Sequence, residues 1–264
     1  MDMPNWVDPR VRVTCTNCGQ RPLCLPAGLS PVELENAEQL VSTRLRIRRG
    51  GALYRIADPF KSLYVLWIGS LKSTLSSGDG REQVAAFHMA GEMVGFDGLG
   101  AGSHTVDVVA LEDAEVCVFP YSRLEDATAP PALRRHLYQL MSREIVRKHA
   151  LVLMLGSMQA HQRLATFLLD LADRFAERGY SKKEFMLRMT RAEIGSFLGI
   201  TLETVSRVLS RFARDGLIDL QHVTQVRILD PQGLRQLAAL APPGRSERAA
   251  RPAATRVLGE QAFA

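Results

Sequence analysis

The chain has 264 residues, of which 46% are hydrophobic, and it carries a formal net charge of +5. This length favours two domains over one, and the apolar content suffices to bury real cores. The basic balance, with a pI of about 9.2, suits a polyanionic partner. Residues 1–10 contain no apolar stretch typical of a signal peptide, and no later segment is long and uncharged enough to cross a bilayer. We therefore expect a cytoplasmic protein without a membrane partner, whose four cysteines stay reduced and act as metal ligands or reactive thiols.

The N-terminal segment, residues 1–30, carries three cysteines in a stretch with little periodicity, and we predict that it is a sensor loop. Their spacing is Cys15-x2-Cys18-x5-Cys24, and a loop of this length can wrap several sulfurs around one centre. Cys117, taken alone, is typical of a buried core cysteine on a strand. Because the chain has four cysteines and no spare one, we predict that Cys117 completes a four-thiolate set of the kind that iron–sulfur clusters use.

Residues 31–130 begin with a short helical pattern over 32–40 and then change in texture. From residue 46 to 120, short apolar runs alternate with glycine-containing turns, which predicts a β-sandwich or roll. We expect an α+β fold whose N-terminal sensory domain is a double-stranded, cupin-like β-roll. The apolar runs are Leu63–Ile68, Val84–Phe87, Val106–Leu111 and Val116–Phe119.

A long helical pattern covers residues 131–158, where five positions recur at alternating intervals of four and three, as in the seam of a coiled coil. Such a seam, on a helix that joins two domains, favours a homodimer interface over a helix packed on its own domain. One position is a lysine, and two lysines meeting across a symmetric seam repel each other, so we expect dimerisation to be open to control. The predicted seam consists of Met141, Ile145, Lys148, Val152 and Leu155.

Residues 159–241 contain the pattern of a helix-turn-helix. Thr190 and Glu193 have the spacing of a capping box, in which each side chain satisfies a backbone N–H of the first helical turn. Gly199 suits the left-handed residue that ends this short helix. Thr201 can then cap a second helix after a tight turn, so the segment predicts a DNA-binding domain.

The second helix of this motif separates into two faces. Its apolar side chains are expected to face the core: Val205, Val208, Leu209 and Phe212. On the other face, Arg207 can bond guanine bidentately and Glu203 can accept from a cytosine amine. The alternative is a solvated charged face, but the capping box, the turn glycine and the placement of the helix agree with DNA binding. The predicted DNA-binding residues are Thr201, Glu203, Ser206, Arg207, Ser210 and Arg211.

Two weaker signals follow this helix. Apolar residues at 217–218 and 226–228 predict a small β-wing. Residues 242–264 are rich in Ala, Arg, Pro and Gly, so we expect a disordered tail.

From about Arg46 to Leu240, the order of β-roll, long helix and winged helix-turn-helix resembles the cyclic-AMP receptor and FNR superfamily of transcription regulators. The run Glu203-x-x-Ser206-Arg207 looks like the recognition motif of that family and matches its base-reading residues. The resemblance implies a homodimer that binds a palindromic operator on double-stranded DNA. It also implies a contact with RNA polymerase at the loop 77–83, which is otherwise typical of an ordinary hairpin turn.

The cysteine pattern is similar to that of the oxygen-responsive FNR branch, and the run 87–97 also resembles that branch. The resemblance implies that Cys15, Cys18, Cys24 and Cys117 ligate a [4Fe–4S] cluster. It further implies that the cluster holds the dimer helix in an associating arrangement, and that oxygen degrades the cluster to leave weakly binding monomers. In the best-known FNR, the position of Lys148 holds an acidic residue. Two lysines that meet across a symmetric seam repel each other just as two acidic residues do, so the change of sign leaves the repulsion in place.

The sequence leaves other kinds of sensor, and an enzyme, as alternatives to an iron–sulfur regulator. Four thiols can form a structural zinc site, although such sites more often use two Cys-x2-Cys pairs, and a thiol-redox or nitric oxide sensor on the same fold stays open. Gly91-Glu92 resembles part of the phosphate cassette for cyclic nucleotides, but residues 102–106 lack the expected arginine, so we predict no cyclic nucleotide. We predict no enzyme, because no βαβ unit surrounds the cysteine pair and no nucleophile accompanies the histidines.

Overall fold

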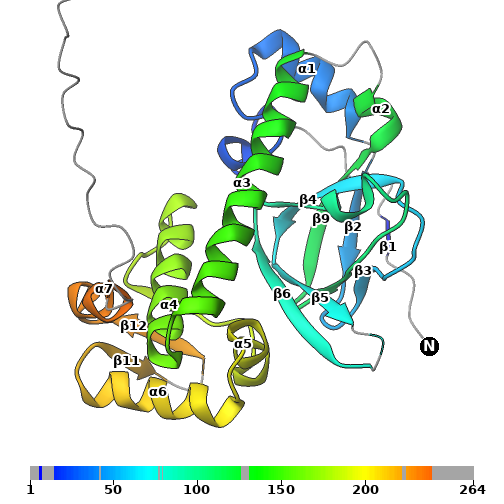
Figure 1. The fold of residues 1–264 in the computed structure, drawn as a ribbon. Helices are drawn as coiled ribbons and strands as arrows, with labels where there is room; N and C mark the ends of the chain where they lie inside the picture. The colour runs from blue at the N-terminus through cyan, green and yellow to red at the C-terminus, as the bar shows by residue number, and fades with distance from the viewer. Residues whose placement is uncertain are drawn as a thin grey trace, which may run out of the picture.

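The computed structural model describes residues 6–7, 15–41, 43–76, 78, 80–125, 131–221 and 224–239. Figure 1 shows two lobes joined by one long helix, a β-roll with short helices at one end and a helical lobe with a small sheet. The predicted α+β fold is confirmed, whereas the predicted tail lies outside the described residues. None of the helices within these ranges combines the length and the apolar character that a membrane crossing needs.

Two antiparallel sheets form the β-roll, with the strand orders β1-β2-β9-β4-β7 and β3-β8-β5-β6. Apolar side chains from both sheets pack into one core between them. The strands of the first sheet are β1 (Trp6–Val7), β2 (Thr43–Ile47), β4 (Ser62–Ile68), β7 (Met93–Val94) and β9 (Ala114–Pro120). Those of the second are β3 (Ala52–Tyr54), β5 (Ser70–Ser76), β6 (Glu82–Met89) and β8 (Asp107–Ala110).

The four predicted apolar runs lie in or overlap β4, β6, β8 and β9, but β5 was not anticipated. Its sequence is largely polar, yet it is paired on both edges, with β6 and with β8. Gly69 makes the turn between β4 and β5 at a φ of 95°, and a Cβ there would lie 2.8 Å from Ala114. Only glycine fits this turn, because both the backbone conformation and the space exclude a side chain.

The helix α3 (Pro131–Ser157) crosses from the β-roll to the second lobe. At the far end of the β-roll, α1 (Pro31–Leu40) begins with a capping box between Ser30 and Glu33. The remaining elements near the β-roll are the 3-10 turns η1 (Arg21–Leu23) and η2 (Phe96–Gly98) and the helix α2 (Tyr121–Glu125).

The second lobe is built from four helices and a three-stranded sheet of order β10-β12-β11. The predicted wing corresponds to β11 and β12, and β10 is an additional strand that pairs with β12. The helices are α4 (Ala160–Glu177), α5 (Arg191–Leu198), α6 (Leu202–Arg214) and α7 (Pro231–Ala239). The strands are β10 (Glu184–Met186), β11 (Ile218–Gln221) and β12 (Gln225–Ile228).

Polar and aromatic contacts join the two lobes along β6. The backbone N–H of Val84 donates to Ser196 Oγ of α5 at 2.9 Å. Beside it, the ring of Phe87 lies with its centroid 5.3 Å from that of Phe197 and 6.0 Å from that of Phe167. The lobe that carries the helix-turn-helix is therefore docked against the β-roll, in addition to being linked to it by α3.

A buried carboxylate adds a second junction between the lobes. Glu92 accepts hydrogen bonds from Arg174 at 2.8 Å and from Arg178 at 2.7 Å, both on or directly after α4. Burial opposes ionisation of this carboxyl, but Arg174, Arg147 and Arg178 lower its pKa to about 2. The ionised carboxylate and its arginines therefore form a charge-assisted network at the lobe boundary.

Candidate metal centre and nucleic-acid interface

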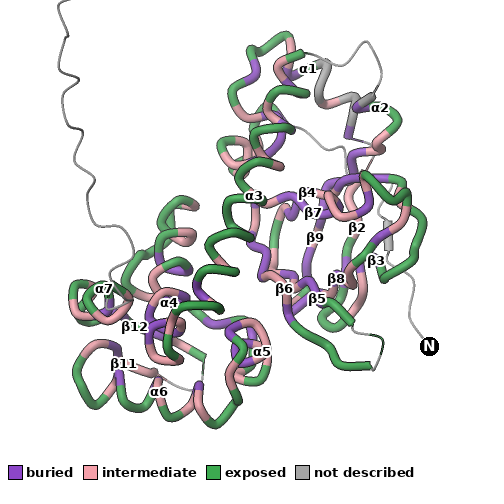
Figure 2. The backbone as a smooth tube through the Cα atoms, viewed as in Figure 1, coloured by how far each residue is buried: buried purple, intermediate pink, exposed green. Residues whose placement is uncertain are grey.

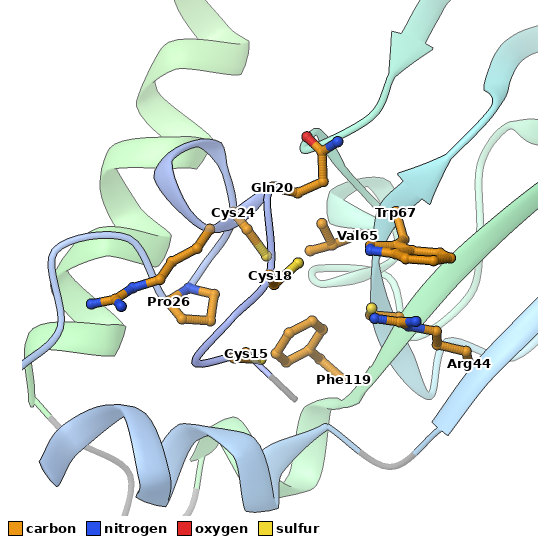
Figure 3. Close-up of a pocket in the computed structure, with 11 residues that line it drawn as sticks. Cys15, Cys18, Gln20, Cys24, Pro26, Arg44, Val65, Trp67 and Phe119 are labelled. Carbon is orange, nitrogen blue, oxygen red and sulfur yellow. The ribbon is translucent and has the colours of Figure 1, made fainter. Parts of the chain in front are cut away.

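The four cysteines of the chain line a single pocket of the β-roll. Cys15, Cys18 and Cys24 come from the loop around η1, and Cys117 comes from β9. Figure 3 shows Cys18 and Cys24 pointing toward Val65 of β4. All four are free thiols, and all except the half-buried Cys18 are buried. The predicted ligands thus come together from two distant segments.

Backbone turns and one carboxylate hold the cysteine loop in place. The N–H of Cys18 donates to the carbonyl of Cys15 at 3.3 Å, which closes the first turn. Glu38 of α1 accepts hydrogen bonds from the backbone N–H groups of Cys15 at 2.6 Å and Thr16 at 2.7 Å. Hydrogen bonds from Thr16 and Cys15 keep the pKa of Glu38 below its ordinary value, so its ionised form anchors the loop to α1.

Three of the four thiols in this pocket have raised pKa values. Burial raises the pKa of Cys15 to about 12 and that of Cys24 well above its usual value, and the neighbouring cysteines add to both effects. Burial also raises the pKa of Cys117, although a hydrogen bond from Arg44 opposes it. Reactive thiolates have lowered pKa values, so the pocket lacks the property of a nucleophilic site. Metal binding here would displace the thiol protons.

The four cysteine sulfurs are suitable donors for a thiolate-bound metal centre. Their positions, however, do not surround a single ion. Within the described ranges, no three Cys, His, Asp or Glu side chains converge closely enough to ligate one ion. A tetrahedral zinc ion, with Zn–S bonds of about 2.3 Å, needs sulfurs roughly 3.8 Å apart. The pocket encloses about 20 Å³, enough for about one water. A larger group therefore requires the pocket lining to rearrange.

The helix-turn-helix has the predicted local structure. Thr190 Oγ accepts from the N–H of Glu193 at 3.2 Å, and the Glu193 carboxylate accepts from the N–H of Thr190 at 2.7 Å. Gly199 has a φ of 62°, and a Cβ at Gly195 would lie 2.6 Å from the carbonyl of Ile200. These two glycines allow the chain to reverse tightly between α5 and α6.

The two faces of α6 are as expected. Val205, Leu209 and Phe212 are buried, and Val208 is half-buried. On the outer face, one shallow hollow is lined by Thr204, Ser206, Arg207, Val208, Ser210, Arg211 and Arg214. The Arg207 guanidinium donates to Thr204 Oγ at 3.2 Å. Four of the six predicted DNA-binding residues, Ser206, Arg207, Ser210 and Arg211, line this hollow, and the other two, Thr201 and Glu203, are exposed at the N-terminal end of α6.

The helix α3 is exposed along most of its length (Figure 2). Of the five predicted seam residues, Ile145 and Val152 are 55% and 70% exposed, and the half-buried Met141 packs on the core around the cysteine loop. Lys148 and Leu155 instead line a cavity against the β-roll, where Lys148 Nζ donates to the carbonyl of Ala85 at 3.1 Å. The exposed apolar face of α3 also contains Val146 and Leu153.

Two residues at the cysteine pocket were missed by the sequence analysis. Arg44 of β2 and Trp67 of β4 line the pocket together, with the Arg44 guanidinium 3.7 Å from the centre of the Trp67 ring. The sequence analysis predicted that the β-region begins at Arg46, so it did not assign Arg44 to a strand. The alternation of charged and apolar residues over 44–47 signals a strand, but no local pattern shows which side chains lie across it.

Comparisons with known proteins agree with this architecture. Residues 44–129 match the family model of a cyclic nucleotide-binding domain, and residues 162–237 match a Crp-like helix-turn-helix domain. The chain is 45% identical over 224 residues to the transcriptional regulatory protein btr of Bordetella pertussis, covering 84% of this chain and 92% of that protein. It is 38% identical over 227 residues to the fumarate and nitrate reduction regulatory protein of Escherichia coli, covering 86% and 90%.

The solved structure of FixK2 from Bradyrhizobium japonicum superposes with a TM-score of 0.70 at 32% identity, covering 76% of this chain and 100% of that one. Proteins of this kind are DNA-binding regulators that act as dimers, and they are not enzymes. The domain order, the helix-turn-helix and the similarity over most of the chain lead to one conclusion: the chain belongs to the Crp/FNR family of transcription regulators.

Proposed function

We propose that this regulator senses oxygen through a [4Fe–4S] cluster held by Cys15, Cys18, Cys24 and Cys117. The observation that carries the proposal is that all four cysteines of the chain, from two distant segments, line one pocket. Clusters of this type use four thiolates. The Escherichia coli relative is named the fumarate and nitrate reduction regulatory protein. A cytoplasmic location, where thiols stay reduced, suits this proposal.

The cysteine pocket is connected to α3 through a shared core. The cluster would supply the reaction with oxygen, which degrades it. The residues packed around the pocket would then transmit the loss of the cluster to α3. Cys15, Cys24 and Cys117 belong to the same buried core as Leu133 and Leu137 of α3. A change in the loop therefore changes the packing of the first half of α3, and the exposed apolar face farther along the same helix is the proposed homodimer interface.

On this proposal, the homodimer presents two copies of α6 to a palindromic operator. Arg207, Glu203 and Ser206 read base edges, while Arg211, Ser210 and Thr201 lie near phosphates. Of the five proposed seam members, Ile145 and Val152 are already exposed on α3, whereas Lys148 and Leu155 line the cavity against the β-roll and would have to turn outward to meet a partner. RNA polymerase is proposed to contact the loop 77–83, of which residues 77 and 79 lie outside the described part of the chain.

We further propose that the protein takes no cyclic nucleotide. A cavity of about 510 Å³ lies between the β-roll and α3, and its described lining includes the carboxylates of Asp97 and Glu144 and one lysine, Lys148. His88 adds no charge at neutral pH, because burial lowers its pKa to about 4. Glu92 of the cassette-like sequence is already paired with arginines. A phosphate in this cavity would therefore meet more negative than positive charge.

The test is metal analysis combined with DNA binding. Protein purified without oxygen is expected to contain about four irons and four sulfides per chain, with a visible colour that bleaches in air. Operator binding, followed by fluorescence anisotropy, should be lost in step with the colour. Zinc that persists in air would establish a structural zinc site instead. Bleaching by nitric oxide but not by air would make nitric oxide the signal, and operator binding independent of any metal would overturn the sensor.

A further inference from the structure

Arg44 lies directly across the sheet from one of the proposed cluster ligands. In the antiparallel pairing of β2 with β9, Arg44 is the register partner of Cys117, and Val65 of β4 is the partner on the other side. The Arg44 side chain lines the cysteine pocket together with Cys117 (Figure 3). The backbone register thus fixes a cation beside this sulfur.

Trp67 holds the guanidinium in this position. The Arg44 guanidinium carbon lies 3.7 Å from the centre of the Trp67 ring, which is the geometry of a cation–π contact. Both side chains line the pocket, and both are half-buried. The contact limits the rotamers of a long side chain, so the cation stays at the pocket wall.

Arg44 also has an unused donor at this place. Its Nε is buried and has no hydrogen-bond partner among the described residues. A buried donor without a partner costs free energy, so its retention at a pocket wall needs a reason. An acceptor that occupies the pocket, such as a sulfur of a bound group, would provide one.

We propose that Arg44, held by Trp67, is a positioning residue that donates to the Cys117 sulfur and raises the resistance of the bound cluster to oxygen. This inference rests on the proposed function. Four thiolates around a cluster leave a net negative charge, and a nearby cation with N–H donors stabilises the more electron-rich state. The reduction potential rises, and loss of an electron to dioxygen becomes harder.

The test compares holoproteins loaded without oxygen. Arg44→Met removes the charge and the donors at similar length, whereas Arg44→Lys keeps the charge. Arg46→Met is the matched control, because Arg46 lies on the same strand but pairs with Glu115 outside the pocket. The readouts are iron and sulfide content, the reduction potential, and the half-time of bleaching after air is added.

Arg44→Met is expected to have a more negative reduction potential and to bleach several-fold faster than the wild type. Arg44→Lys should recover part of both changes, and Arg46→Met should behave as wild type. Unchanged potential and half-time in Arg44→Met, or equal changes in Arg46→Met, would overturn the role of Arg44.

If Arg44→Met does not load a cluster, Trp67→Leu decides the matter, because it frees the guanidinium without removing it. Bleaching of Trp67→Leu that is faster than that of the wild type supports the inference, and bleaching at the wild-type rate contradicts it. A wild-type protein without iron and sulfide would instead overturn the proposed function itself.

Discussion

Lys72 of β5 and Glu193 of α5 form an ion pair at 2.7 Å that joins the β-roll to the first helix of the helix-turn-helix. Both side chains are about one-fifth exposed, so solvent screens the pair only in part. The same Glu193 carboxylate completes the capping box with Thr190. One carboxylate therefore stabilises the start of α5 and joins α5 to the β-roll.

Removing the lysine should loosen the docking of α5 and leave both folds intact. Lys72→Met is expected to speed amide hydrogen exchange in α5 by up to about fivefold, in line with a loss of at most ~1 kcal/mol. Lys182→Met is the matched control, because Lys182 pairs with Asp173 within the DNA-binding lobe. Exchange in α5 that is the same in both variants would show that the ion pair does not hold the lobes together.

The buried Glu92 network should contribute far more than the Lys72 pair. Glu92→Gln removes the buried carboxylate charge that pairs with both Arg174 and Arg178, which costs on the order of 3–5 kcal/mol. Urea unfolding of the DNA-binding lobe, followed by circular dichroism, measures the loss. Asp170→Asn is the control, since Asp170 bonds the same Arg174 but is 59% exposed. Equal stability of the two variants would contradict a dominant role of Glu92.

The features predicted most accurately from the sequence are those that depend on residues close to one another in the chain. The Thr190–Glu193 capping box and Gly199 with its positive φ are local devices, and their spacing alone identified the helix-turn-helix. The polar strand β5 escaped prediction because its neighbours β6 and β8, rather than its own composition, make it a strand.

Contacts between distant segments could not be predicted in this way. The cysteine count indicated that Cys117 would join the N-terminal loop, but not that Arg44 would lie opposite it, because strand register follows from the whole sheet. The spacing on α3 likewise identified a long helix with an apolar seam. It did not show that Lys148 and Leu155 turn toward a cavity of the β-roll, since that depends on how the helix is rotated in the fold.

A buried histidine should make the β-roll sensitive to mild acid. Burial lowers the pKa of His88 to about 4, whereas the unfolded chain binds the proton near 6.5. The neutral ring, bonded to Ser73 Oγ at 2.6 Å, is therefore favoured at high pH. Up to about 3 kcal/mol of stability is lost as the pH falls from 6.5 to 4. Urea unfolding across this range should show a weaker pH dependence for His88→Gln. His149→Gln, which changes an exposed histidine, should retain the full pH dependence of the wild type. If the stability of the wild type, His88→Gln and His149→Gln changed equally with pH, His88 would not be the group responsible.

Base recognition by α6 can be separated from its attraction to phosphates. Arg207→Ala is expected to lose ~1–3 kcal/mol of operator affinity and to relax specificity at one base pair, if its contact with guanine is bidentate. Arg214→Ala, at the exposed end of the same helix, should weaken operator and scrambled DNA alike. Titrations at two salt concentrations distinguish these effects. A wild-type protein that binds operator and scrambled DNA equally would rule out base reading by Arg207.

Loss of one proposed cluster cysteine should remove DNA binding without unfolding the chain. Cys24 is buried in the core that the cysteine loop shares with α3, so Cys24→Ala removes a proposed ligand and leaves only a small cavity. Without oxygen, the variant should retain its circular dichroism spectrum, lack the cluster colour and fail to bind the operator. Val65→Ala is the matched control, because Val65 lines the same pocket and is equally buried but offers no ligand. It should lose some stability and still bind the operator in an air-sensitive way. Operator binding by Cys24→Ala as tight as that of the wild type would mean that the cysteine pocket does not control association with DNA.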